Sequence, residues 1–162
     1  MGFSGNFLEW LLNYLSNRLQ FVQIDNKTLD LDNVIFGIPQ GSIMGPIIFN
    51  LYVSDLTGQL QCQCFQYADD TTLLLHTTVG NLHNATAEMN NVIEDLESYS
   101  SDSNLSLNKA KTKWMLVSSA QMSRVHSLAN SPISLNCECT ELERLESTKL
   151  LGVHLDTNLS WN

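Results

Sequence analysis

Asp69 and Asp70 are adjacent carboxylates placed between two short apolar stretches, Leu60–Phe65 and Thr71–His76. Two like charges side by side repel each other, and aspartate is a poor strand residue. One interpretation is a turn, where aspartate is common, although the two threonines that follow do not match the Asp-Gly signal of a two-residue hairpin. The other is a site for a hard cation such as Mg²⁺, because carboxylate oxygens bind that ion and its charge relieves the repulsion.

A loop rich in glycine and proline, Gly37–Pro46, precedes the apolar stretch Ile47–Leu56. Ser42 can cap a helix and Pro46 suits a first helical turn, so a helix is expected over this stretch, ending near Leu56–Gly58. Gly41 fits two roles equally well. It either lets a ligand approach the backbone closely, or it only forms a strained turn.

Three of the eight Lys and Arg residues lie close together, at Lys109, Lys111 and Lys113. They follow residues 82–99, whose apolar side chains recur at helical spacing and predict an amphipathic helix of about five turns. No Lys or Arg occurs between Lys27 and Lys109. A lysine at a helix exit is usually only solvated, so the cluster by itself indicates no function.

Taken in order, these segments resemble the palm region of reverse transcriptases, particularly those of non-LTR (LINE-type) retrotransposons. The resemblance covers nearly the whole chain, and the order of the motifs is more specific than any one of them. Gly37–Pro46 resembles motif B, Tyr67–Asp70 resembles motif C and Leu105–Lys113 resembles motif D. Lys149–Trp161 resembles the region around motif E, and Arg18–Val22 resembles the segment before motif B.

The resemblance implies RNA-directed DNA polymerisation by two-metal nucleotidyl transfer. The cofactor would be Mg²⁺, and the partners an RNA template, a DNA primer and deoxynucleoside triphosphates. Asp69 would be the principal metal ligand and Asp70 a secondary one, both of them catalytic. Tyr67 and Ala68 would lie against the primer end.

The resemblance also assigns roles outside this acidic pair. Gln40 and Gly41 would contact the incoming nucleotide or the templating base. Lys111 matches the motif D lysine, which protonates or neutralises the pyrophosphate. Leu151 and Gly152 match the primer-grip turn, for which an ordinary strand and bend is the alternative.

In the family, motif A supplies a further metal-binding aspartate from a strand that precedes the first helix expected here. Asp25, Asp30 and Asp32 lie in a hairpin before motif B, and nothing in their context makes them substitutes. We therefore expect residues 1–162 to form a single partial reverse transcriptase domain with motifs B to E but without fingers, motif A and thumb. Such a fragment is expected to be unstable or sticky, to bind Mg²⁺ weakly or not at all, and to be inactive alone.

Two other functions compete with this interpretation. One is a non-catalytic RNA- or protein-binding remnant of a retroelement, and the other is a small carboxylate metal-binding protein. The net charge of −9 disfavours the first, because a domain that grips nucleic acid by itself usually has a basic face. The second leaves the Gly37–Pro46 loop and the Lys149–Trp161 segment unexplained.

Composition excludes further classes of protein. With 43% apolar and 15% charged residues, the chain does not resemble a disordered protein. No apolar run approaches the ~20 residues that cross a membrane, and the N-terminus is not a secretory signal, so an intracellular location is expected.

The four cysteines form two Cys-x-Cys pairs, Cys62/Cys64 and Cys137/Cys139. This spacing matches zinc sites poorly. In a strand, residues two apart share a face, so each pair is more simply read as two small apolar side chains.

The expected fold class is α+β, with an antiparallel sheet and a motif C hairpin backed by helices, as in part of a polymerase palm. Besides the elements above, a helix is expected over residues 5–17 and a surface loop over Ser119–Pro132. The remaining strands are expected at Arg18–Asp25, Leu29–Phe36, Lys113–Ser118, Ile133–Cys139 and Leu145–Leu155.

Overall fold

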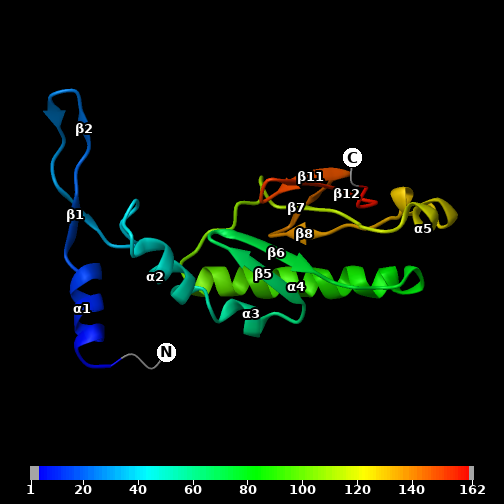
Figure 1. The fold of residues 1–162 in the computed structure, drawn as a ribbon, viewed down its shortest axis with the longest axis horizontal. Helices are drawn as coiled ribbons and strands as arrows, with labels where there is room; N and C mark the ends of the chain where they lie inside the picture. The colour runs from blue at the N-terminus through cyan, green and yellow to red at the C-terminus, as the bar shows by residue number, and fades with distance from the viewer. Residues whose placement is uncertain (1–3, 161–162) are drawn as a thin grey trace. The chain divides into compact units, whose positions relative to one another are not determined.

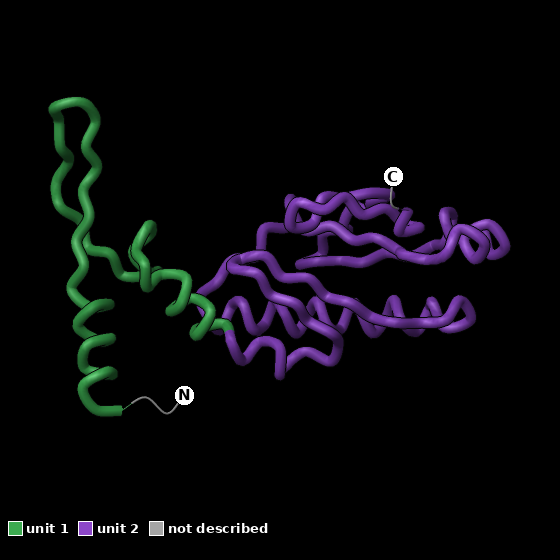
Figure 2. Tube along the Cα trace, viewed as in Figure 1, with its two compact units in different colours: residues 1–53 green, residues 54–162 purple. Residues whose placement is uncertain are grey.

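The computed structural model describes residues 4–160 (Figure 1). The chain divides into two compact units, residues 1–53 and 54–162 (Figure 2).

Unit 1 begins with helix α1, Asn6–Leu15, which the helical spacing of apolar residues predicted. The predicted hairpin follows it, and its strands pair antiparallel, β1 with β4 and β2 with β3. These strands are β1 (Arg18–Gln20), β2 (Gln23–Ile24), β3 (Lys27–Thr28) and β4 (Asp32–Val34).

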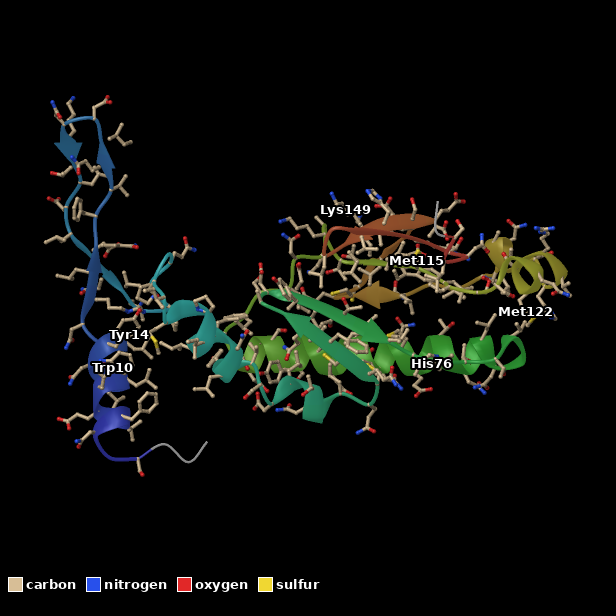
Figure 3. All side chains as sticks on the ribbon, in the orientation of Figure 1. Trp10, Tyr14, His76, Met115, Met122 and Lys149 are labelled. Carbon is tan, nitrogen blue, oxygen red and sulfur yellow. The ribbon has the colours of Figure 1, made fainter. Side chains whose placement is uncertain are left out.

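The apolar residues at the start of unit 1 are largely exposed. Along one face of α1, the ring of Trp10 stacks on those of Phe7 and Tyr14, with centroid distances of 5.9 and 5.3 Å (Figure 3). None of residues 4–44 is buried. The apolar spacing in this region therefore marks a face that the described part of the chain does not cover.

Helix α2, Gly45–Tyr52, begins as expected but ends earlier. The Gly45 N–H donates to Ser42 Oγ at 2.9 Å, and Pro46 lies in the first turn. The predicted end of this helix near Leu56–Gly58 was wrong, because the chain turns after Tyr52 and a separate short helix, α3 (Leu56–Gln59), follows. Val53 and Leu56 are buried at the two ends of the turn, so these apolar residues reflect burial and not one continuous helix.

In unit 2, strands β5 (Gln63–Tyr67) and β6 (Asp70–Leu74) form an antiparallel hairpin. A short 3₁₀ helix, η1 (Val79–Asn81), leads into the long helix α4, Leu82–Asp102, which confirms the predicted amphipathic helix.

Helix α4 is the centre of unit 2 because two of its faces are buried in different clusters. Val92 and Tyr99 pack with Leu56 and Leu60, and the inner side chains of the β5–β6 hairpin cover this cluster. Ile93 faces the other cluster, which consists otherwise of Leu135, Cys137 and Leu142. A single helix thus joins the hairpin to the C-terminal part of the unit.

The C-terminal part differs from the sequence pattern in several places, since the strands expected at Lys113–Ser118 and Ile133–Cys139 are only Lys113–Trp114 and Asn136–Cys137. The expected surface loop Ser119–Pro132 contains helix α5, which Ser119 caps, and η2, whose Leu128 is buried. The expected single strand Leu145–Leu155 is a hairpin, because the chain reverses after Leu150. The elements here are β7 (Lys113–Trp114), α5 (Ala120–Val125), η2 (Leu128–Asn130), β8 (Asn136–Cys137), β9 (Thr140–Glu141), β10 (Glu143–Arg144), β11 (Ser147–Leu150) and β12 (Val153–Asp156).

The fold class is α+β, as predicted, but the strands do not form one sheet. In residues 4–160 they form six two-stranded ladders, of which β7–β10 is parallel and the others are antiparallel. Among the helices of this described part, none is long and apolar enough to span a membrane.

The two cysteine pairs differ in structure. Cys62 and Cys64 both pack against the core, as expected for small apolar side chains, although Cys62 lies just before β5 and not in the strand. Cys137 is buried, but Glu138 and Cys139 have positive φ values of 43° and 62° and form a turn between β8 and β9. The expectation that Cys137 and Cys139 share a strand face was therefore wrong. All four thiols are free.

Candidate active site

The acidic pair lies at the turn of the β5–β6 hairpin. Tyr67 and Asp70 are the last paired residues of the two strands, so Ala68 and Asp69 form a two-residue turn between them. Asp69 and Asp70 are both exposed. The turn was predicted from the apolar stretches on either side, although the residues at its tip lack a glycine.

The two faces of this hairpin have different environments. Cys64 and Leu73 point to the core that α4 forms, which anchors the hairpin. On the other face, the side chains of Phe65 and Tyr67 are 57% and 66% exposed. Paired residues share a face in an antiparallel ladder, so Asp70 is on the exposed face beside Tyr67. The hairpin thus presents one carboxylate at its turn and one next to an aromatic ring.

Ala68 adopts a positive φ of 53° at the first central position of the turn, a conformation that glycine adopts without strain. We expect Ala68→Gly to stabilise unit 2 by about 0.5–1 kcal/mol, because the relief of strain exceeds the extra entropy of the unfolded chain. Urea unfolding measures the change. The matched control is Ala87→Gly, an exposed position in α4, which should destabilise by about 1 kcal/mol. A loss of stability with Ala68→Gly would contradict the strain.

Gln40 and Gly41 are in unit 1, whereas the acidic turn is in unit 2. Both are exposed in a turn that the Ser42 N–H closes by donating to the Pro39 carbonyl at 3.4 Å. Gly41 has a φ of 77° and open space where a Cβ would be. The positive φ explains the glycine as a turn residue, and the open space leaves its backbone accessible to a ligand. Both roles from the sequence analysis remain.

Lys111 is exposed in a tight turn after α4. Its flanking lysines are paired, Lys109 with Glu138 and Lys113 with Glu143. Within residues 4–160, Lys111 itself has no ion pair. Both glutamates lie far from the lysines in sequence, and no local signal indicated their role.

Leu151 and Gly152 form the two-residue turn of the β11–β12 hairpin. Their φ values of 47° and 90° are both positive, as in a type I′ turn. Lys149, two residues before it, is labelled in Figure 3 toward the end of unit 2 where α4 ends. Figure 1 shows the β5–β6 turn and the loop that follows α4 at the same end. The acidic turn and the loop after α4 that contains Lys111 therefore lie at the same end of unit 2.

Tyr99 is a further residue that supports this end of the unit. Its hydroxyl donates to Asp55 Oδ1 at 2.8 Å, which ties the turn before α3 to α4. The helical spacing predicted that Tyr99 is in the core, where it lies. Its hydrogen bond joins residues 44 positions apart, so sequence pattern alone gave no sign of it.

Comparison with known proteins gives the family of this chain. The family model for reverse transcriptase (RNA-dependent DNA polymerase) matches residues 3–155. The chain belongs to the reverse transcriptase family.

Among curated proteins, this reverse transcriptase chain is similar to the RNA-directed DNA polymerase from mobile element jockey of Drosophila melanogaster. The two are 23% identical over 159 residues, which is 93% of this chain and 16% of the relative. The chain thus spans about a sixth of the length of that protein. These matches confirm the resemblance to reverse transcriptases of LINE-type elements. No solved structure matches the chain.

Reverse transcriptases generally depend on Mg²⁺, and the acidic turn can be tested for its fit to that ion. Mg²⁺ sites that also bind substrate phosphates commonly take one or two carboxylates from the protein. Asp69 and Asp70 offer this number of hard oxygen donors, both exposed. No group of three or more His, Cys, Asp or Glu side chains in residues 4–160 is arranged to hold a metal ion. The acidic turn therefore fits as part of a metal site.

Proposed function

We propose that this chain is a part of an RNA-directed DNA polymerase, and that Asp69 and Asp70 are its contribution to the metal site. The observation that supports this proposal most directly is that a hairpin packed against the core presents both carboxylates, exposed, at its tip. Asp69 would be the principal ligand and Asp70 the secondary one. When bound, Mg²⁺ supplies activation of the primer hydroxyl and neutralisation of charge on the triphosphate.

The residues around the acidic turn would position the substrates. The exposed ring of Tyr67 gives the hairpin a flat apolar surface for the primer end, and Ala68 adds no bulk beside it. Leu151 and Gly152 would contact the primer from the β11–β12 turn. Gln40 and Gly41 would contact the incoming nucleotide or the templating base, and the open space at Gly41 permits close approach.

Lys111 would act on the leaving group. As an exposed cation with no ion pair among the described residues, its ammonium is available to neutralise the pyrophosphate or to give it a proton from Nζ. This role agrees with its place in the motif D match.

We further propose that the chain is inactive alone. Two-metal chemistry in this family needs a further aspartate from motif A, and the acidic turn has only two carboxylates. The isolated chain is also expected to be sticky, because large apolar side chains of the described residues are exposed, among them those of Ile35, Phe36 and Ile43.

Primer extension tests this part of the proposal. The purified chain, given an RNA template, a DNA primer, deoxynucleoside triphosphates and Mg²⁺, is expected to add no nucleotides above background. Mg²⁺-dependent extension that Asp69→Asn abolishes would confirm the polymerase assignment and overturn the inactivity. Extension that Asp69→Asn leaves unchanged would point to a contaminating enzyme.

A further inference from the structure

We propose that Asn108, Glu138 and Glu143 are positioning residues that leave Lys111 as the one lysine of its turn free to meet a phosphate group. The inference rests on the proposed role of Lys111 in the polymerase and goes beyond it. It explains how a turn with three lysines acts as a single positive charge. It also assigns a role to two glutamates that lie outside the matched motif.

Asn108 fixes the backbone of the lysine turn. Its Oδ1 accepts the Lys111 N–H at 3.2 Å, and its carbonyl accepts the N–H groups of Lys111 at 3.0 Å and Thr112 at 2.9 Å. The Thr112 hydroxyl donates to the same carbonyl at 2.9 Å. The position of the Lys111 backbone is thereby set while its side chain stays exposed.

Glu138 neutralises the lysine before Lys111. Its carboxylate pairs with Lys109, and this hydrogen bond raises the pKa of the lysine. The glutamate is itself held in place, because its backbone N–H donates to the Glu97 carboxylate of α4. Burial, and second the hydrogen bond with Glu97, raise the pKa of the neighbouring Cys137 thiol to about 11. The β8–β9 turn is thus fixed to α4 through Glu97.

Glu143 neutralises the lysine after Lys111. It lies directly opposite Lys113 in the parallel β7–β10 ladder, and their side chains pair. The next residue, Arg144, lies over the ring of Trp114 at 5.1 Å and donates to the Leu128 carbonyl at 2.8 Å. The Trp114 Nε1–H donates to the Leu142 carbonyl at 3.1 Å. These contacts hold β10 against β7 beside the ion pair.

The two ion pairs change what the turn can bind. Three free lysines close together would attract nucleic acid along its backbone without selectivity, and binding would fall steeply with salt. With Lys109 and Lys113 already paired, the turn offers one charge at one place. A single ammonium suits one phosphate group and not an extended polyanion.

Lysine methylation and pyrophosphate titration of the full chain test the inference. Reductive methylation with ¹³C-formaldehyde gives an NMR signal for each lysine and needs an amine that the reagent can reach, which an ion pair with a carboxylate hinders. In the unchanged chain, Lys111 is expected to react about two- to fivefold faster than Lys109 and Lys113. Added inorganic pyrophosphate is expected to shift the Lys111 signal most.

Single substitutions test the two ion pairs separately. Glu138→Gln is expected to raise the methylation rate of Lys109 alone to that of Lys111, and Glu143→Gln to do so for Lys113 alone. Glu141→Gln is the matched control, because Glu141 is an exposed glutamate between them. Asn108→Ala is expected to speed amide exchange at Lys111, and Asn108→Asp, which keeps the acceptor oxygen, to restore it.

The outcomes distinguish this inference from the proposed function. Equal methylation rates for the three lysines in the unchanged chain, or unchanged rates in both glutamine variants, would overturn the positioning roles. The expected rates without a pyrophosphate shift at Lys111 would support the positioning and contradict the phosphate role. Shifts of equal size at all three lysines would contradict the positioning while a phosphate role stands.

Discussion

Asp69→Asn is expected to weaken the binding of Mn²⁺, a probe for Mg²⁺, at the β5–β6 turn by about tenfold or more. Loss of a group that only orients a metal ligand typically lowers the metal affinity 10- to 100-fold. Removal of the ligand itself should lower the affinity at least as much. In the unchanged chain, Mn²⁺ should bind weakly and broaden the NMR amide signals of Tyr67–Thr71 selectively. Asp70→Asn should reduce this broadening less than Asp69→Asn, since Asp70 is proposed as the secondary ligand.

Asp95→Asn is the matched control for this measurement. Asp95 is an exposed aspartate in α4, so the change in net charge is the same while the acidic turn stays intact. It should leave the broadening at the turn unchanged. Broadening that centres on another part of the chain, or that survives Asp69→Asn and Asp70→Asn together, would contradict the proposed metal site.

Leu56→Ala is expected to destabilise unit 2 by about 3 kcal/mol, the typical cost of a cavity at a buried leucine. Leu56 is 3% exposed and packs with Val92 and Tyr99 of α4 and with the inner face of the β5–β6 hairpin. A loss of this size is a large share of the 5–15 kcal/mol that stabilises a typical domain. Urea unfolding measures this loss of stability. Amide exchange in α4 shows whether the loss reaches the helix that Leu56 contacts.

The matched control is Leu12→Ala in α1, where the leucine is 57% exposed. Alanine is the best helix former and no cavity results, so the change in stability should stay within about 0.5 kcal/mol. Similar losses for the two variants would contradict the core described for unit 2. If Leu56→Ala lowers the stability and also speeds amide exchange at the Asp69 turn, this core supports the acidic pair.

Several parts of the fold could be predicted from the sequence because their signals are local. The spacing of apolar residues predicted α1 and α4, and the two successive strand candidates Arg18–Asp25 and Leu29–Phe36 predicted the hairpin of unit 1. The apolar stretches on both sides of Asp69 predicted the hairpin turn at the acidic pair. Helical and strand periodicities need only neighbouring residues, so a sequence displays them directly.

The failures occurred where long-range packing decides. The early end of α2 and the split of the expected 145–155 strand both follow from turns inside apolar runs. Leu128 shows the same effect in reverse, because tertiary contacts bury it within a segment whose polar composition indicated a loop. The apolar character of Val53, Leu56 and Leu128 agrees with their burial, but it does not record which way the chain continues.

By itself, the sequence determined the order of the motifs, the family that they indicate and the acidic pair at a turn. Only the tertiary structure decided which groups surround that pair and the lysine turn. Tyr99 meets Asp55 across 44 residues, and Glu138 and Glu143 reach the lysines across about 30. Such pairings depend on how α4 and the short ladders pack together, and that packing depends on volumes and distances that no local pattern contains.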